Sequence, residues 1–425
     1  MKKIAIVGFG GAGYNAARSA RKYDPDAVID VYTDIDVGPY NPMLTTYFIK
    51  GAIGYDALFP FGSLETIREE LDLKIYEKTA VVAMDAEKRR LVLSDGASRE
   101  YDSILISTGA CAFMPPIAGI DLPGVFKMRT AADAVTLKNE LDKGTAKTGL
   151  VIGASWVGIK VIEDFAARGI RCTLVDGAKR IFPTATFDQT AERIHADLRK
   201  KGVELSFEQM LARIEREADG RITAVMENGN RFTADLIVVC IGIRANIRFA
   251  MDAGIKAGRA LIVDEKMQTS APGIYAAGDC CEAIDVQTGL PKNIGVWMNA
   301  QRQGAVAGAN MVGVPMEFGA NMLLNLAHYM DYDFVSFGDI TTCSPEDETY
   351  EYEDSRYYIL AKKKDGKVTC INMIGTADSN GIIKQVLLRA FETGRLGLDA
   401  ATTCFLKEKG FPDGFIDFIG GTILD

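Results

Sequence analysis

The feature that most constrains this chain is a strand, a glycine-rich turn and a helix that follow one another twice. Near the N-terminus the apolar strand from Lys3 to Val7 leads into GFGGAG, and the pattern then predicts a helix from about Gly11 to Lys22 and a strand from Ile29 to Tyr32. A similar unit begins at Gly149, where GLVIG precedes GASWVG, a helix through Ala167 and the strand RCTLVD. Alternating strands and helices are typical of α/β units with parallel strands. The repeat therefore predicts one supersecondary unit used twice.

The turn of the first unit has the glycine spacing of a dinucleotide-binding loop. In GFGGAG, Gly8 permits a tight turn, Gly10 lets the backbone approach a pyrophosphate, and Gly13 allows the helix to pack closely. Gly11 and Ala12 begin the helix, where free N–H groups are available to phosphates. We therefore predict that these five residues bind the phosphates of a dinucleotide.

The turn of the second unit follows the same pattern with one change. In GASWVG, Gly153 and Gly158 hold the outer positions, and Ser155 replaces the middle glycine. Trp156 and Val157 complete the turn at the start of the helix. We predict that these residues bind a second dinucleotide.

Carboxylates stand where each unit would contact a ribose. Asp176 ends the strand RCTLVD, and a carboxylate there bonds both ribose hydroxyls and repels a 2′-phosphate, which favours NADH over NADPH. Arg180 lies near enough in sequence to weaken this preference. In the first unit, Asp34 is the candidate in VYTD, and Asp36 is the weaker one.

A third glycine-containing segment, TSAPGIYAAGDC, delivers Gly278 and Asp279 at the end of a short apolar strand. An aspartate in this position accepts hydrogen bonds from a polyol chain, although an ordinary turn would show the same pattern. A glycine-rich loop and a helix follow in NIGVWMNAQRQGAVAGANMVG.

The order of segments predicts three domains in an α/β fold. Hairpin-like stretches, VVAMDAEKRRLVLSDG and LARIEREADGRITAVMENGNRFTADL, are followed by similar strands that run into glycine, YDSILISTGA and ADLIVVCIGI. We predict two Rossmann-like dinucleotide-binding domains, one discontinuous domain formed by residues 1–113 and 243–318 and one formed by residues 114–242. A small α+β domain, residues 319–425, contains strands in SRYYILAKK and KVTCINMIG and a helix from about Ile382 to Thr393.

The composition excludes several classes of protein. A net charge of -9 and a pI near 5.1 argue against a nucleic-acid-binding protein, which needs a basic face. The sequence has no apolar run of about 18 residues that would cross a membrane. The N-terminal MKKIAIVGFG is interpreted as a strand and not as a signal peptide, so we expect a cytoplasmic protein.

Cysteine and histidine usage gives little support to a metal site. The 8 cysteines are scattered without CxxC spacings, and we expect reduced, mostly buried thiols, with Cys280 and Cys281 serving packing. Of the 2 histidines, His195 lies on a charged helix and is expected on its solvated face. His328 is expected in the core. Both are interpreted as structural.

These motifs together resemble the pyridine nucleotide-disulfide oxidoreductase superfamily, in its FAD-dependent members, over about residues 1–315. The similarity is closest to the NADH:rubredoxin and ferredoxin reductase-like members that lack a redox-active disulfide. The resemblance implies FAD on the first loop, NAD(P)H on the second, and Asp279 on the ribityl chain. The segment STGA, Ser107 to Ala110 with Thr108 and Gly109, would close the flavin domain.

Other residues acquire a role from the same resemblance. Trp297 stands where such reductases place a tryptophan beside the isoalloxazine ring, and the helix beginning near Asn299 would point at the N1–C2=O edge of the flavin. Val81 and Gly242 complete the set of predicted cofactor-binding residues. Ordinary core packing remains the alternative for Trp297.

The chain also departs from the family pattern at the reacting centre. The position of the redox cysteine reads Met43, and no cysteine occurs between Met1 and Ala110, which argues against a thiol relay at the flavin. The usual ribose-binding glutamate aligns with Thr33, which weakens the assignment of Asp34. The paired lysine and glutamate of the ferredoxin-reductase branch read Thr46 and Lys160.

The positive charge has thus moved from one position of this pair to the other. We suggest that Lys160 points toward flavin N5 or the nicotinamide carboxamide and tunes the flavin electrostatically. Met43 and Thr46 would lie beside it as further catalytic residues. A solvated lysine on the helix surface is the alternative.

The resemblance implies hydride transfer from the nicotinamide C4 to flavin N5, followed by release of electrons to a protein carrier such as rubredoxin or ferredoxin, or to a partner reductase. One alternative is a direct NADH oxidase or a reductase of a small organic acceptor, bound near Met43 and Tyr47. Another is a slow-turnover NADH-sensing interaction flavoprotein. The superfamily contains both homodimers and monomers, so the oligomeric state stays open.

Overall fold

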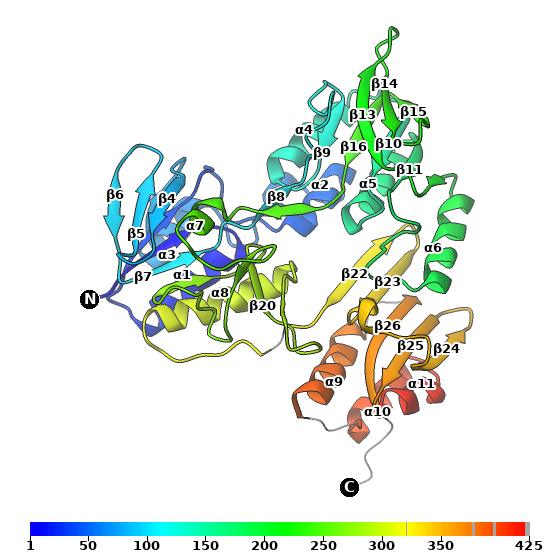
Figure 1. Cartoon of the computed structure of the whole chain (residues 1–425). Helices are drawn as coiled ribbons and strands as arrows, with labels where there is room; N and C mark the ends of the chain where they lie inside the picture. Colours follow the sequence, from blue (N-terminus) through cyan, green and yellow to red (C-terminus); the bar gives the residue numbers. More distant parts are fainter. Residues whose placement is uncertain (320, 376–378, 394–396, 421–425) are drawn as a thin grey trace.

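The structure is a computed structural model that describes residues 1–319, 321–375, 379–393 and 397–420. Two α/β regions and a C-terminal α+β region lie side by side in Figure 1. The first is blue to cyan and yellow-green where the chain returns to it, the second is mainly green, and the third is yellow to red. No helix of the described residues is long and apolar enough to cross a membrane.

A parallel sheet with the strand order β19-β7-β1-β2-β3 forms the centre of the first region. Its strands and the helices of this region are β1 (Lys3–Val7), α1 (Gly11–Tyr23), β2 (Val28–Tyr32), α3 (Leu64–Leu71), β3 (Lys74–Tyr76), β7 (Ser103–Ile106), α7 (Arg248–Asp252), β19 (Ile274–Ala276) and α8 (Trp297–Met311). The predicted elements at residues 3–7, 11–22 and 29–32 are confirmed. Because β19 pairs with β7, the chain returns to the first sheet after leaving it, as the sequence predicts.

The second region repeats this plan with the strand order β12-β11-β10-β16-β9. Its elements are β9 (Val125–Lys127), α4 (Ala131–Leu141), β10 (Thr148–Ile152), α5 (Trp156–Ala166), β11 (Arg171–Val175), α6 (Asp188–Lys200), β12 (Glu204–Ser206) and β16 (Leu236–Val239). All pairings in this sheet are parallel. The predicted duplication is therefore present as two similar parallel sheets.

Small antiparallel sheets accompany the two parallel ones. The hairpin-like stretches fold as β4 (Val81–Asp85), β5 (Arg90–Leu93) and β6 (Ser98–Glu100), and as β13 (Leu211–Arg216), β14 (Ile222–Met226) and β15 (Arg231–Ala234). The two chain crossings between the regions pair as β8 (Ala110–Ala112) and β17 (Ile243–Ala245). A further sheet comprises β18 (Leu261–Ile262), β20 (Cys281–Ile284) and β21 (Pro291–Lys292).

One segment of the N-terminal region packs on the second region. The turns η1 (Pro42–Leu44) and η2 (Tyr55–Leu58) flank the short helix α2 (Thr45–Lys50). Ile49 of α2 is fully buried in a core shared with α4 and α5, and Arg168, just beyond the end of α5, donates a hydrogen bond to its carbonyl oxygen. The domain boundaries at residues 113, 242 and 318 stay a prediction. Helix α2 belongs by sequence to the first predicted domain, but it packs against helices of the second.

The C-terminal region is an antiparallel sheet, β22-β23-β26-β25-β24, with helices against it. Its elements are β22 (Leu324–Tyr329), β23 (Tyr332–Phe337), η3 (Ile340–Thr342), β24 (Glu348–Glu353), β25 (Tyr358–Lys364), β26 (Lys367–Gly375), α9 (Asn380–Thr393), α10 (Ala400–Glu408) and α11 (Asp413–Phe418). The side chains of β22 and β23 join the core of the second region, and Figure 1 shows these strands reaching toward α5 and α6.

Candidate active site

The first glycine-rich loop is shaped by its own backbone. Gly8 has a φ of +90°, and a Cβ placed there would lie 2.5 Å from the carbonyl oxygen of Ser107. A Cβ on Gly13 would lie 2.4 Å from the carbonyl oxygen of Gly8. At Gly10, by contrast, no atom of the described residues lies within 4 Å of the position that a Cβ would take. The outer glycines are therefore required by the protein itself, and the middle one borders an open cradle that suits a pyrophosphate.

Helix α8 supports this cradle from behind. A Cβ on Gly304 would lie 2.1 Å from the carbonyl oxygen of Ala12, and one on Gly308 would lie 2.2 Å from that of Ala16. Small residues on both helices thus let α1 and α8 approach closely. The side-chain oxygen of the buried Gln303 accepts a hydrogen bond of 2.9 Å from the backbone N–H of Gly278, so α8 also holds the third predicted segment.

Asp279 forms an ion pair with Arg129, a residue that the sequence reasoning missed. The side chains are 12% and 21% exposed respectively, and Arg129 also donates to the carbonyl oxygen of Ala110. Arg129 precedes the N-cap of α4, where Thr130 and Asp133 form a capping box. The TAAD pattern of this box was the available signal. The ion pair thus brings a cation from the start of the second region to Asp279 of the first region.

The segment STGA lies against both the first loop and the chain crossing. The hydroxyl of Ser107 donates to the carbonyl oxygen of Gly8 at 2.7 Å. Thr108 and Asn246 exchange hydrogen bonds between side chain and backbone, and Gly109 has a φ of +62° and accepts from the N–H of Asn246. The predicted residues of this segment therefore connect the loop to the returning chain.

Trp297 lies directly over the first loop. A Cβ on Gly11 would lie 2.7 Å from the Trp297 ring, and this ring stacks with Phe61, which in turn stacks with Tyr14 at 4.0 Å between centroids. The side chain of Asn299 points inward, where it donates to the carbonyl oxygen of Ile294. Trp297 is half-buried with the ring beside the cradle, whereas Asn299 serves the interior of the loop.

The three candidate ribose-binding residues after β2, Thr33, Asp34 and Asp36, differ in burial and in their partners. Thr33 is buried and its carbonyl oxygen accepts from the N–H of Thr79, shortly before the predicted Val81 on β4. Asp34 is exposed. Asp36 forms an ion pair of 2.7 Å with Lys78, so its carboxylate already has a partner.

The second loop repeats the outer geometry of the first. Gly153 has a φ of +115° and its Cβ would lie 2.3 Å from the carbonyl oxygen of Cys240, while a Cβ on Gly158 would lie 2.1 Å from the oxygen of Gly153. Ser155 caps α5 by accepting from the N–H of Gly158, and its hydroxyl donates to the oxygen of Cys240. Gly242, with a φ of +123°, immediately precedes the crossing strand β17.

Asp176 closes this loop through its carboxylate. One oxygen accepts from the N–H of Ala154 and the other from the N–H of Ala178, both at 2.6 Å. Arg180 instead donates to the carbonyl oxygen of Thr186 and pairs with Asp188 at 2.9 Å. The side chain of Arg180 is therefore engaged away from Asp176.

Trp156 and Val157 of the second loop belong to the interface with the C-terminal region. The Trp156 ring stacks with Phe182 at 4.2 Å and with Phe334 at 5.5 Å, with interplanar angles of 16° and 5°, and these two rings also stack with each other. Val157 is partly buried against the same core. The Trp156 ring is thus held against the C-terminal region, and its contact with a nucleotide stays a prediction.

Lys160 lies between three elements and is not a solvated surface lysine, since its side chain is 14% exposed. Its ammonium group pairs with the buried Glu163 and donates to the carbonyl oxygen of His328 at 2.9 Å. It also lies 5.0 Å from the centroid of the Tyr47 ring on α2. The alternative of ordinary solvation is wrong, and a role beside the flavin stays a prediction.

Met43 and Thr46 differ in exposure. Met43 is 55% exposed on η1, whereas Thr46 on α2 is 6% exposed. Asp164 of α5, which follows Glu163 in the sequence, is also buried. Burial raises the pKa of its carboxyl to about 8, although the nearby Arg168 lowers this pKa. Among the described residues, its Oδ2 atom has no hydrogen-bonding partner.

Both histidine environments were predicted wrongly. His195 is 1% exposed, its Nε2 accepts from the N–H of Ile181, and its ring stacks on Phe207. The side chain of His328 is 44% exposed and contacts Asp333 at 2.9 Å. Cys280 and Cys281 are buried as expected, and burial raises the pKa of both thiols.

Comparisons with known proteins place the chain among redox enzymes. A family model described as pyridine nucleotide-disulphide oxidoreductase matches residues 2–304. The chain is 34% identical over 322 residues to an NADH oxidase of Methanocaldococcus jannaschii, covering 74% of this chain and 71% of that protein. It is 28% identical over 341 residues to a rubredoxin-NAD(+) reductase of Pseudomonas putida, covering 78% and 88%.

A solved structure extends the similarity beyond the matched family region. An NAD-dependent persulfide reductase from A. fulgidus superposes with a TM-score of 0.82 at 25% identity. The match covers 92% of this chain and 77% of that chain, so it includes much of the C-terminal region.

Proposed function

Because the chain belongs to the pyridine nucleotide-disulphide oxidoreductase family, we propose that it takes hydride from NADH onto FAD and passes electrons to a protein carrier, such as rubredoxin or ferredoxin, or to a partner reductase. The chain is an oxidoreductase, and FAD and a nicotinamide nucleotide are the cofactors of its family. The observation that carries the acceptor proposal is the methionine at the predicted thiol position. Met43 is exposed, and the sequence has no cysteine before Cys111.

The residues of the first loop would hold the FAD. The open cradle at Gly10 and the N-terminus of α1 suit the pyrophosphate, and Asp279 with Arg129 supplies a polar edge for the ribityl and phosphate groups. Trp297 covers one side of the cradle. When bound, the flavin accepts two electrons as hydride and releases them singly or together.

The second loop would position the nicotinamide nucleotide. The N-terminus of α5 offers backbone donors to its phosphates, and Asp176 carries negative charge at the end of β11. Arg180 is paired with Asp188, so its charge is engaged away from a 2′-phosphate. This arrangement supports a preference for NADH over NADPH.

Release of electrons without a thiol relay favours a carrier protein. With methionine at position 43 and no cysteine before Cys111, this chain offers no thiol there to relay electrons, so a bound flavin would supply them directly to the acceptor. The relative from Pseudomonas putida is named as a rubredoxin-NAD(+) reductase, which supports this class of partner. A carrier for this chain should present basic groups, because the net charge of the chain is -9.

The proposal is tested by titrating the purified yellow protein with NADH under anaerobic conditions. We expect uptake of two electrons per flavin, followed by fast reoxidation with rubredoxin or ferredoxin and slow reoxidation with oxygen. Stopped-flow spectra measure both steps. Equal rates with oxygen and with carrier proteins would contradict the acceptor proposal while leaving the flavin assignment intact.

A direct NADH oxidase is the second candidate, because the relative from Methanocaldococcus jannaschii carries that name and Met43 is exposed. Fast turnover with oxygen or one small organic acceptor, without any carrier, would favour it. A slow-turnover sensing protein would instead show a stable charge-transfer colour with NADH and little acceptor reduction. A homodimer and a cytoplasmic location stay predictions, and light scattering measures the first of these.

The role of Lys160 needs a test that separates tuning from packing. Lys160→Met leaves the buried Glu163 unpaired, so it is expected to destabilise the fold, whereas the double variant Lys160→Met with Glu163→Gln restores neutrality. A changed flavin reduction potential in the stable double variant supports tuning. An unchanged potential assigns the pair to structure alone.

A further inference from the structure

Two cysteines that are 27 residues apart in the sequence meet in the C-terminal region. Cys343 follows the turn η3, and Cys370 lies within β26. Their Sγ atoms are 3.0 Å apart, which is within hydrogen-bonding distance for sulfur. Both thiols are free, as expected, and the fold of the sheet brings them together although they are far apart in the sequence.

The two thiols differ in exposure and in acidity. Cys370 is fully buried, and burial raises the pKa of its thiol well above its ordinary value. Cys343 is partly exposed, and its hydrogen bond with Cys370 lowers the pKa of its thiol to about 7. Lys362 lowers this pKa further, while Asp347 opposes it. Near neutral pH, Cys343 is thus the accessible thiolate and Cys370 is its buried proton donor.

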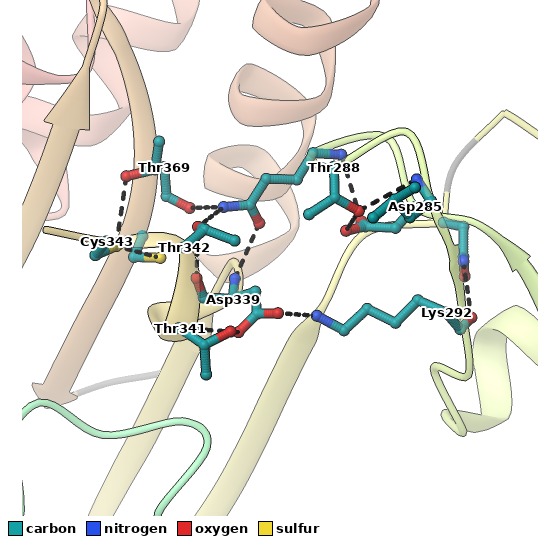
Figure 2. Close-up of polar contacts among 12 residues, drawn as sticks. Asp285, Thr288, Lys292, Asp339, Thr341, Thr342, Cys343 and Thr369 are labelled. Carbon is teal, nitrogen blue, oxygen red and sulfur yellow. Dashed lines mark hydrogen bonds and ion pairs between the residues drawn. The ribbon is translucent and has the colours of Figure 1, made fainter. Parts of the chain in front are cut away.

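A hydrogen-bonded frame holds the segments that carry both cysteines (Figure 2). Gln287 donates to the hydroxyl of Thr342 at 2.9 Å and to the carbonyl oxygen of Thr369 at 3.2 Å. These are the residues that immediately precede Cys343 and Cys370. The side-chain oxygen of Gln287 also accepts from the N–H of Asp339, whose carboxylate pairs with Lys292. The spacing of the two sulfurs therefore rests on an ordered frame that includes the loop between β20 and β21.

Cys343 lines a pocket of about 400 Å³ between the C-terminal sheet and the segment that leads into α6. Lys179, Arg180 and Lys362 contribute positive charge to its wall, and Asp188 contributes the opposing carboxylate. Asp188 pairs with both Lys179 and Arg180, while the ammonium group of Lys362 donates to Thr349. The pocket thus combines an accessible sulfur with a net positive wall.

We propose that Cys343 and Cys370 form a redox-active thiol pair whose substrate is a small anionic disulfide bound in this pocket. The Cys343 thiolate attacks one sulfur of the disulfide RSSR, the S–S bond of RSSR breaks, and RS⁻ leaves and takes up a proton. Cys370 then loses its proton, attacks Sγ of Cys343 and releases the second RSH. The balance is one RSSR and two cysteine thiols to two RSH and one protein disulfide, with two electrons passing to the substrate.

This activity is independent of the flavin proposal, because it needs neither NADH nor the glycine-rich loops. Reaction with an excess of a small thiol runs the exchange backward and restores the pair. The site would add a thiol-disulfide function to the region that lies beyond the matched family residues 2–304.

The test uses the full-length flavoprotein, reduced with a phosphine that is then removed under anaerobic conditions. Three probes are compared: oxidised glutathione, which is anionic, hydroxyethyl disulfide, which is neutral, and cystamine, which is cationic. We expect oxidised glutathione to convert the pair to a Cys343–Cys370 disulfide, detected as a joined peptide by mass spectrometry. At low salt its rate should exceed that of cystamine by about tenfold, equivalent to about 1.4 kcal/mol of electrostatic preference.

Matched variants separate attack from resolution. Cys370→Ser is expected to stop at a stable glutathione adduct on Cys343, and Cys343→Ser to leave Cys370 unreacted. Cys404→Ser is the control, since Cys404 is an exposed thiol on α10 away from the pair. Absence of a joined peptide, or reaction of Cys343 no faster than Cys404, would overturn the proposal.

The charge of the substrate is tested at the pocket wall. The variant Lys179→Met, which leaves Lys362 in place, is expected to slow oxidised glutathione by about threefold and to leave the rate with hydroxyethyl disulfide unchanged. The neutral probe thus reports whether the variant still folds around the pair. If cystamine reacts with the unaltered protein as fast as oxidised glutathione, the anionic substrate class is wrong.

Discussion

The two glycine-rich loops are alike at their outer positions and different in the middle. In both loops a Cβ on the last glycine would meet the carbonyl oxygen of the first, at 2.4 Å for Gly13 and 2.1 Å for Gly158. The middle position is open at Gly10, whereas Ser155 uses its side chain to cap α5. The outer glycines are therefore required for the loop to fold, and only the middle position is free to differ with the ligand that the loop binds.

The helices behind the loops differ more strongly than the loops. Helix α1 packs on α8 through glycine and alanine, so its surroundings are apolar and close. Helix α5 faces α2 and the C-terminal sheet and carries the buried carboxyls Glu163 and Asp164, together with the stacked ring of Trp156. The second loop is thus tied to the C-terminal region, whereas the first is tied to the chain that returns after Ile243.

The comparison first predicts that the outer glycines carry stability. In Gly158→Ala the new methyl group would meet a backbone oxygen that cannot move without opening the turn. We expect a loss of about 4 kcal/mol or more in the free energy of unfolding, or an insoluble protein. Urea unfolding followed by circular dichroism measures the loss. Gly381→Ala in α9 is the control, because no described atom lies within 4 Å of its Cβ position.

The second largest expected effect on the free energy of unfolding comes from the buried carboxyl of Asp164 in α5. Helix α1 has no acidic residue that would correspond to it. The folded carboxyl of Asp164 keeps its proton to about pH 8, whereas in the unfolded chain it ionises near pH 4. The unfolded state therefore binds fewer protons between these values, and the free energy of unfolding falls as the pH rises through this window. Asp164→Asn removes this loss and should gain several kcal/mol at pH 8 relative to pH 4, since each pKa unit is worth about 1.4 kcal/mol.

Urea unfolding of the Asp164→Asn variant and the unaltered protein at several pH values checks this prediction. The difference between the two proteins cancels the groups that titrate in both. A difference that does not change between pH 4 and pH 8 would mean that Asp164 ionises normally in the folded protein. Glu163 is the neighbouring comparison, because its carboxylate is already paired with Lys160.

The middle glycine predicts an effect on binding without one on folding. A methyl group in Gly10→Ala meets no described atom, so the stability of the flavin-free protein should stay within about 1 kcal/mol. The same methyl group would enter the cradle, and we expect FAD affinity to fall by about tenfold to a hundredfold. Quenching of flavin fluorescence measures the affinity. Unchanged affinity would show that the pyrophosphate lies elsewhere.

Much of the fold followed from the sequence because local patterns determine local elements. The strand, turn and helix of each unit lie within a few residues of their predicted bounds, since the hydrophobic runs and glycines that define them are contiguous. The two histidines show the limit. The helix pattern around His195 identified a charged face, but it carried no information about Phe207, which covers that side chain.

The candidate site was predictable only where one segment supplies it. The loops at Gly8 and Gly153 are single segments, and their positive φ values agree with the predicted turns. The ion pair between Arg129 and Asp279 spans 150 residues, and the sulfur pair joins a turn to a strand. Such contacts depend on how the sheets are placed, which no local pattern encodes.

Replacing Asp176, at the nucleotide end of the second loop, is expected to change the preference for NADH over NADPH by about tenfold. Asp176→Ser removes the carboxylate that would repel a 2′-phosphate, and we expect the ratio of kcat/KM for NADH over NADPH to fall by about that factor. The hydrogen bonds to Ala154 and Ala178 are also weakened, so KM for NADH should rise. Steady-state assays with an artificial acceptor measure both ratios. A constant ratio would assign Asp176 to closing the loop alone.

The smallest expected effect comes from replacing Ser155, which occupies the middle position of the second loop as Gly10 does in the first. In Ser155→Ala the N–H of Gly158 loses its capping oxygen, and the expected cost is about 1 kcal/mol in the free energy of unfolding. Ser155→Gly should cost only a few tenths of a kcal/mol, because glycine is itself an acceptable N-cap residue. Urea unfolding measures both variants, and NADH binding should remain close to that of the unaltered protein. Since Gly10 and Ser155 occupy the same position of the pattern, a large loss of NADH affinity in Ser155→Ala would instead mean that this hydroxyl contacts the nucleotide, and that the middle position serves the ligand in both loops.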